Sequence, residues 1–140
     1  MRATTIEQSR HLLELGLKAE TADMYWERGY LDTHQESNDE LRELTEPIDF
    51  NEHLLSLVPA WSFGALYLLL YRCGGTATDA PHLCEDIPGQ GWYFHCYGMN
   101  YETASFPTMV EAAYDYVVWL LENKHYRFDN EWYIRKNKED

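Results

Sequence analysis

Thiol and imidazole side chains that could bind a metal ion are concentrated in one third of the chain, at Cys73, His82, Cys84, His95 and Cys96. Structural zinc usually takes paired ligands such as C-x-x-C. Here one residue separates His82 from Cys84, whereas His95 and Cys96 are adjacent and would point to opposite faces of a strand. We therefore expect no metal, and we interpret the three cysteines as reduced, structural thiols.

Other arrangements that carry chemistry also lack a local signature. The sequence contains no G-x-S-x-G, no HExxH, no phosphate-binding glycine loop and no dinucleotide fingerprint. The adjacent acids Glu85-Asp86 and Asp39-Glu40 fall in polar segments, where carboxylates are ordinarily solvated. We expect no catalytic and no cofactor-binding residues, and a small enzyme without a recognisable motif remains an alternative.

The elements that would position any such side chains begin with an amphipathic helix near the N-terminus. Thr5 and Gln8 have the spacing of a capping box, which predicts the start of this helix. Gly16 is placed to end it in the left-handed conformation, so that Leu17 folds back onto Leu12.

The segment from Leu54 to Cys73 has the length of a membrane-spanning helix and only one charge, Arg72. Pro59 and Ser62 interrupt it, because proline breaks a helical ladder and serine is a good N-cap. We therefore predict a shorter helix that starts after Ser62, is apolar almost all round and is buried on several sides. No membrane span is expected.

Residue types favour a β-hairpin with strands from Trp92 to Tyr97 and from Tyr101 to Phe106. Alternation divides the first strand between two faces, with Trp92, Phe94 and Cys96 on one and Tyr93, His95 and Tyr97 on the other. The first set buries more apolar area and should face the helices. The second set should be wholly or partly exposed, and we predict that Tyr93, His95 and Tyr97 form a partner-binding surface.

Together the elements predict an α+β fold, in which three main helices pack on a small antiparallel sheet in the rough order α-β-α-β-β-α. The first strand is expected at Ala22–Trp26, and the last helix from Pro107 to Asn123 with Thr108 and Glu111 as a second capping box. The alternating residues Trp132–Ile134 are compatible with an additional C-terminal edge strand.

The chain has a formal net charge of −13, and much of this charge lies in one stretch. From Glu27 to His53, nine acidic residues face only two arginines, Arg28 and Arg42. Such a surface repels phosphate backbones, so direct nucleic-acid binding is not expected. The 140 residues are predicted to form a single domain, with an acidic insertion at about 28–47, interpreted as a loop, and a C-terminal extension at about 127–140.

Four sequence blocks together resemble a known family. The blocks are Thr5–Arg10 with Leu12–Leu17, Ala22–Met24, Pro59–Ser62 with Ala65-Leu66, and Glu111–Asp115 with Trp119-Leu120. In order and spacing they resemble a family of small uncharacterised proteins encoded by Bacteroidetes genomes, prophages and mobile elements. The resemblance implies an intracellular bacterial setting. Because that family has no assigned activity, the resemblance implies no functional residues.

Five tryptophans and eleven tyrosines exceed what a core of this size requires. Because Tyr and Trp are enriched in interfaces, the sequence favours a cytoplasmic, non-enzymatic protein-binding or accessory domain, with an unknown protein partner or a homodimer. The alternative from the charge is an acidic inhibitor that imitates nucleic acid and is encoded by a mobile element.

Overall fold

The computed structural model describes residues 1–29, 39–53, 56–74, 82–96 and 101–123. Their three α-helices are α1 (Ile6–Glu14), α2 (Phe63–Gly74) and α3 (Met109–Glu122), and the two short 3-10 helices are η1 (Ala19–Thr21) and η2 (Phe50–Glu52). The strands are β1 (Met24–Glu27), β2 (Glu40–Glu43), β3 (Leu57–Ala60), β4 (His82–Glu85), β5 (Trp92–Cys96) and β6 (Tyr101–Glu102). The protein therefore has an α+β fold.

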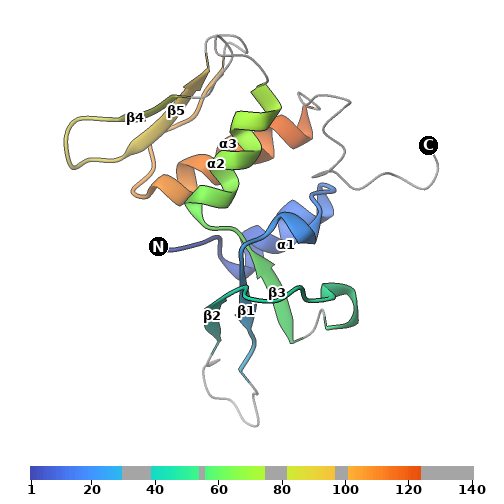
Figure 1. The fold of residues 1–140 in the computed structure, drawn as a ribbon. Helices are drawn as coiled ribbons and strands as arrows, with labels where there is room; N and C mark the ends of the chain where they lie inside the picture. The colour runs from blue at the N-terminus through green and yellow to red at the C-terminus, as the bar shows by residue number, and fades with distance from the viewer. Residues whose placement is uncertain (30–38, 54–55, 75–81, 97–100, 124–140) are drawn as a thin grey trace.

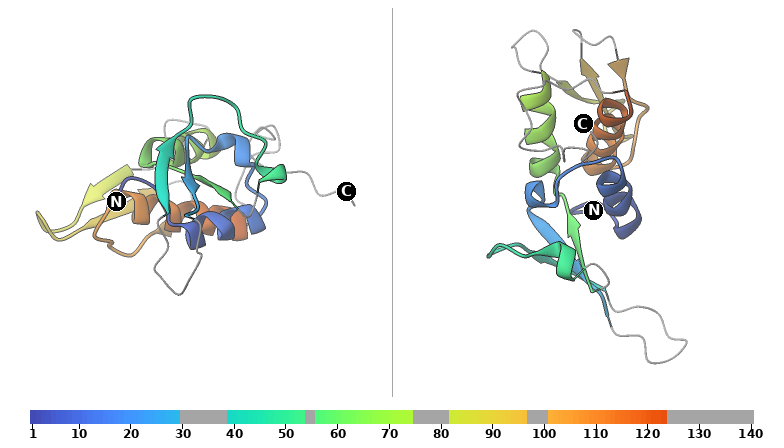
Figure 2. Two further views of the ribbon diagram at one scale, coloured as in Figure 1. Left: turned by 90° about the horizontal axis from the view of Figure 1, so that it is seen from below. Right: turned by 90° about the vertical axis from the view of Figure 1, so that its right-hand side faces the viewer.

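The strands form two antiparallel sheets rather than the single sheet that the sequence suggested. One sheet has the order β2-β1-β3 and the other the order β4-β5-β6. The sheets lie at opposite ends of the layer of helices (Figures 1 and 2). We call them the lower sheet (β1, β2, β3) and the upper sheet (β4, β5, β6), after their places in Figure 1. No helix of the described segments is long and apolar enough to cross a bilayer.

The ends of α1 follow the sequence prediction. Thr5 accepts a hydrogen bond from the Gln8 amide at 3.1 Å, and the Gln8 side chain accepts one from the Thr5 amide at 3.0 Å. At the other end Gly16 has a φ of 101°, and the Leu17 amide donates to the Leu12 carbonyl at 3.1 Å. Both ends are thus fixed by local interactions.

The main core lies between α2, α3 and the upper sheet. Phe94 of β5 is fully buried there, and its ring lies 6.3 Å from Phe63 and from Tyr67 of α2, and 5.9 Å from Tyr116 of α3. Leu12 and Leu17 extend the same core to α1 and its C-terminal turn. The helices therefore cover one face of the upper sheet.

A second, small cluster belongs to the lower sheet and consists of Ala3, Met24 and Ala60, with Trp26 and Leu41 packed beside it. The buried residue Thr4 connects this cluster to the helical body. Its carbonyl accepts a hydrogen bond from Trp26 Nε1 at 2.8 Å, and its hydroxyl accepts one from the Trp61 amide at 3.1 Å. Because Trp61 is fully buried, these bonds anchor the sheet at its junction with the helices.

Three strands lie where the sequence was interpreted differently. β2 falls within the acidic stretch, which was expected to be a loop, and it pairs with β1 from Met24↔Glu43 to Glu27↔Glu40. β3 contains Pro59, which is tolerated because β3 is an edge strand of its sheet. β4 lies in the expected loop before Trp92. In each case pairing with another strand, rather than local residue preference, creates the strand.

Helix α2 is less buried than its composition suggested. Leu66, Leu69 and Leu70 are buried, but Leu68 is 45% exposed and Tyr71 is 59% exposed. The prediction that α2 is buried on several sides is therefore wrong for the stripe that carries these two residues. The predicted Ser62 cap is confirmed, since Ser62 Oγ accepts a hydrogen bond from the Ala65 amide at 3.2 Å.

Helix α3 begins as expected after Thr108, whose hydroxyl accepts a hydrogen bond from the Glu111 amide at 3.1 Å. The capping box itself differs from the prediction. The Glu111 carboxylate accepts from the Thr108 hydroxyl at 2.9 Å, whereas a capping box would use the Thr108 amide. The C-terminal extension and the edge strand considered at residues 132–134 lie outside the described residues.

Candidate functional site

The outward face of the upper sheet is the candidate site, because the helices cover the opposite face. Phe94 points into the core, so the alternation of β5 places Tyr93 and His95 on the outward face. Pairing adds neighbours to each of them. Cys84 of β4 is opposite Tyr93, and His82 of β4 and Glu102 of β6 are opposite His95. We call these five residues the outward patch.

The outward patch combines aromatic, imidazole, thiol and carboxylate groups. His95 Nδ1 lies 3.5 Å from Glu102 Oε1, and the side chain of His95 is 27% exposed. Contact with the Cys84 side chain raises the pKa of Tyr93 above its ordinary value, and the charge of Glu102 adds to this effect. The Tyr93 phenol is thus protonated at neutral pH and can both donate and accept hydrogen bonds.

The turn between β4 and β5 is fixed by polar side chains at the end of this sheet. The Asp86 carboxylate accepts hydrogen bonds from the Ile87 amide at 2.9 Å and from the Ser105 hydroxyl at 2.7 Å. The Ser105 bond first, and then the Ile87 bond, lower the pKa of Asp86. Ile87 is 63% exposed on this turn. The turn therefore holds a large apolar side chain in solvent.

A glycine is required where the turn enters β5. Gly91 has a φ of 141°, and a Cβ atom at this position would lie 2.8 Å from the Phe106 carbonyl oxygen. Phe106 and Trp92 exchange two backbone hydrogen bonds of 2.8 and 2.9 Å beside it. The backbone segments at Gly91 and Phe106 therefore approach closely at the end of the sheet that carries the outward patch.

The structure describes two of the three residues predicted to bind a partner. Tyr93 and His95 are both half-buried and share the outward face, whereas Tyr97 lies outside the described residues. On the inward face Phe94 is fully buried and Trp92 is half-buried. The side chain of Cys96 is outside the description, so its predicted inward position stays a prediction.

Sequence reasoning missed His82, Cys84 and Glu102 as members of this patch. His82 was considered only as a metal ligand, Cys84 as a metal ligand or a structural thiol, and β4 was interpreted as a loop. The alternation His82-x-Cys84 was a usable signal, because residues two apart in a strand share a face. No group of three or more His, Cys, Asp or Glu residues within the described segments is placed to hold a metal ion. Of the five candidate metal ligands that the sequence offered, the side chain of Cys73, like that of Cys96, lies outside the description.

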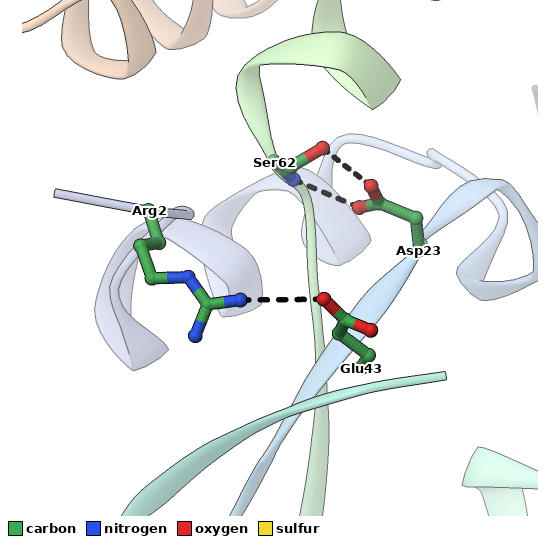
Figure 3. Close-up of polar contacts among 4 residues, drawn as sticks. All are labelled: Arg2, Asp23, Glu43 and Ser62. Atoms are coloured by element: carbon green, nitrogen blue, oxygen red, sulfur yellow. Dashed lines mark hydrogen bonds and ion pairs between the residues drawn. The ribbon is translucent and has the colours of Figure 1, made fainter. Parts of the chain in front are cut away.

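A second polar site lies where β1 begins, beside the start of α2 (Figure 3). Asp23 accepts hydrogen bonds from the Ser62 amide at 2.9 Å and from the Ser62 hydroxyl. Arg2 forms an ion pair of 3.4 Å with Glu43 beside them. These four residues, together with Met24 and Leu44, line a surface hollow of about 420 Å³.

The chemistry of this hollow is that of a helix cap. The Ser62 hydroxyl donates to Asp23 and accepts from the amide of Ala65, so both of its roles are occupied. An activated serine needs a base with a pKa near neutrality, and none of the six lining residues is a histidine. The geometry therefore supports a structural role for Asp23 and Ser62 rather than nucleophilic catalysis.

Comparison with protein-family models, with curated proteins and with solved structures finds no match. The resemblance to small proteins of Bacteroidetes, prophages and mobile elements therefore stays a prediction.

Proposed function

We propose that this chain is a non-enzymatic protein-binding or accessory domain of the cytoplasm, and that the outward patch of the upper sheet is its contact surface. The observation that carries the proposal is the one-sided packing of this sheet. Phe94 and Tyr101 meet the helices, whereas Tyr93 and His95 face away from them. The partner is another protein or a second copy of the chain.

The composition of the outward patch supports binding. Tyr93 offers a broad apolar ring with a polar end, a combination that is enriched in protein interfaces. His95 and Glu102 add polar groups that can determine orientation. Ile87, on the turn at the end of the same sheet, adds an exposed large apolar side chain to this part of the surface.

The same residues give less support for catalysis. An enzyme would need a nucleophile, a base and a group that orients the base around one concave site. The hollow at Ser62 lacks a histidine among its lining residues, and the outward patch lies on a strand face rather than in one of the described hollows. A binding role therefore explains the arrangement with fewer assumptions.

The acidic-inhibitor alternative is weakened by ion pairs in the lower sheet. Arg42 lies between Glu27 at 3.4 Å and Glu40 at 2.6 Å, and Arg28 is 3.2 Å from Asp39. These pairs reduce the density of free negative charge where the sequence is most acidic. The salt dependence of binding distinguishes the two functions. The affinity of a charge mimic falls steeply as ionic strength rises, whereas the affinity of an aromatic surface does not.

Site-specific photo-crosslinking tests the proposal. We would introduce p-benzoylphenylalanine at Tyr93, with Glu122 at the exposed end of α3 as the matched control position. In cells that express the full chain, position 93 should give one discrete crosslinked species, identified by mass spectrometry as a partner or as a second copy. Position 122 should not give it.

The double variant Tyr93→Ser/Tyr97→Ser provides the second measurement. We expect association with the identified species to weaken while the melting temperature changes little, because neither tyrosine contributes to the main core in this proposal. The same crosslinks from both positions, or assembly unaltered by the double variant, would show that this face is not the contact surface.

A further inference from the structure

We propose a second interaction surface, independent of the outward patch: a groove that binds a segment of another protein carrying apolar and basic side chains. The groove lies between the C-terminal turn of α1 with η1 on one side and the chain from β2 to η2 on the other. In Figure 1 this chain leaves β2, passes across β1 and β3, and reaches η2 beside β3. It runs from Leu44 to Phe50.

Two adjacent hollows make up this groove, and they share Glu20 and Phe50. The larger has a volume of about 390 Å³ and is lined by Glu20, Leu44, Thr45, Glu46, Pro47, Ile48 and Phe50. The smaller has a volume of about 220 Å³ and is lined by Leu13, Leu17, Lys18, Ala19, Glu20, Phe50 and Asn51. The larger volume lies in the range of sites that hold small ligands or a few side chains.

The larger hollow is lined mainly by apolar side chains, whereas the smaller one combines apolar and polar side chains about equally. Phe50 is 5% exposed and lines both hollows. Leu44 and Ile48 are half-buried on one side, and Leu13 is half-buried on the other. These side chains leave apolar area in contact with water, which an apolar side chain of a ligand would cover.

The charges at the groove indicate a basic ligand. Glu20 and Glu46 are exposed, and within the described part of the chain neither forms an ion pair. In this they differ from Glu27, Glu40 and Glu43, which arginines pair on the lower sheet. Lys18, in the smaller hollow, is the one cation among the lining residues. A ligand that places its cations over the larger hollow would therefore meet uncompensated carboxylates.

The same charges disfavour the other occupants. A nucleic acid would be repelled by the carboxylates. A second copy would bring another chain of net charge −13 against this acidic rim. An uncharged apolar ligand would make no ion pair with the carboxylates of Glu20 and Glu46. A basic, amphipathic peptide segment satisfies both the apolar lining and the rim.

Fluorescence anisotropy with a defined peptide tests this surface. The probe is the fluorescein-labelled hexapeptide Lys-Leu-Trp-Ile-Arg-Lys, titrated with the full-length protein. Two control peptides replace its basic residues by glutamate or its apolar residues by serine. We expect the probe to bind and both controls to bind about tenfold more weakly or worse, because each lacks one half of the complementarity.

Charge reversal in the protein supplies the decisive comparison. Glu20→Lys/Glu46→Lys should weaken binding of the probe by about tenfold, since two carboxylates of the rim are lost. Glu7→Lys/Glu122→Lys makes the same change in net charge elsewhere, on α1 and α3, and should leave binding within about twofold. Ile48→Asp should weaken binding through the apolar lining, with a thermal melt to confirm that the variant is folded.

Three results would each overturn the proposal. The first is no binding of the probe to the native protein. The second is equal binding of the acidic control peptide, which would indicate an unselective apolar hollow. The third is an equal loss of affinity in the two charge-reversal variants, which would indicate general attraction to an acidic protein rather than a site at Glu20 and Glu46.

Discussion

The two sheets both have three antiparallel strands, but they are supported differently. In the upper sheet, Phe94 of the central strand packs among aromatic rings of α2 and α3. In the lower sheet, Met24 of the central strand meets Ala3 and Ala60 in a small cluster. The comparison shows that two three-stranded antiparallel sheets can rest on very different amounts of buried apolar surface.

The sheets also differ in the side chains on their exposed faces. The lower sheet presents ion pairs such as Arg42 with Glu40, and exposed pairs of this kind usually contribute little to stability. The upper sheet presents Tyr93 and His95 beside Cys84. We infer that the upper sheet combines the stabilising core and a binding surface on its two faces, whereas stability of the lower sheet depends on its junction with the helices.

The largest expected effect comes from the upper sheet. Phe94→Ala should lower the free energy of unfolding by about 3 to 5 kcal/mol, because the ring is fully buried and its removal leaves a cavity. Urea denaturation followed by circular dichroism measures it. His95→Ala, on the opposite face of the same strand, is the matched control and should change stability by less than about 1 kcal/mol.

A similar loss in the two variants would contradict this division of faces. It would mean that His95 is as important to the core as Phe94, and Tyr93 and His95 would then be unsuitable as a binding surface.

The next effect belongs to the lower sheet. Met24→Ala should lower the free energy of unfolding by about 2 kcal/mol, at the low end for a buried methionine, because the cluster around it is small. The same urea titration compares it directly with Phe94→Ala. If Met24→Ala proves as costly as Phe94→Ala, the lower sheet is as important to stability as the main core and the comparison fails.

The local features of this fold could be predicted from the sequence. Thr5 with Gln8, and Gly16 with Leu17, define the ends of α1 through contacts between near neighbours, and these were correct. The strand at Trp92 was also predicted, because β-favouring residues follow one another there. Residue types and short spacings contain this information directly.

The missed features depend on pairing with another strand. Glu40–Glu43 has the composition of a loop, and it becomes a strand because β1 pairs with it. The same applies to β4, whose pairing with β5 brings His82 and Cys84 to the outward patch. The site was therefore only partly predictable, since alternation along β5 identified Tyr93 and His95 but not the three residues opposite them.

A smaller effect is expected at the junction between the lower sheet and the helices. Ser62→Ala removes the cap of α2 and the bond to Asp23, and should cost about 1 kcal/mol. Ser62→Thr keeps a hydroxyl and is the control. Thermal melts of the two variants provide the measurement, and equal melting temperatures would show that the cap contributes little.

The smallest effect on stability at neutral pH is expected from a change at Tyr101, on the inward side of the upper sheet. It is also the most specific effect, because it depends on one titrating group. The ring of Tyr101 stacks on Trp119 with centroids 4.0 Å apart, and its hydroxyl donates to Asp115 Oδ2 at 3.0 Å. Burial, followed by the charge of Asp115 and this hydrogen bond, raises the pKa of Tyr101 from 10.0 to about 12. The folded state therefore holds the phenol proton more tightly than the unfolded chain does.

This difference determines the sign of the pH dependence. The stability that comes from the raised pKa is fully present below about pH 10, and it is lost as the pH rises from about 10 towards 12. Tyr101→Phe keeps the stacked ring and removes the titrating proton, so its stability should fall less over this range. Urea midpoints of both proteins, measured at intervals from about pH 9 to pH 12, test this. Tyr114, whose pKa burial also raises, is present in both and cancels in the difference. Parallel curves for the two proteins would show that Tyr101 is not held protonated by the fold, and the contact between β6 and α3 would then be weaker than the stacking geometry indicates.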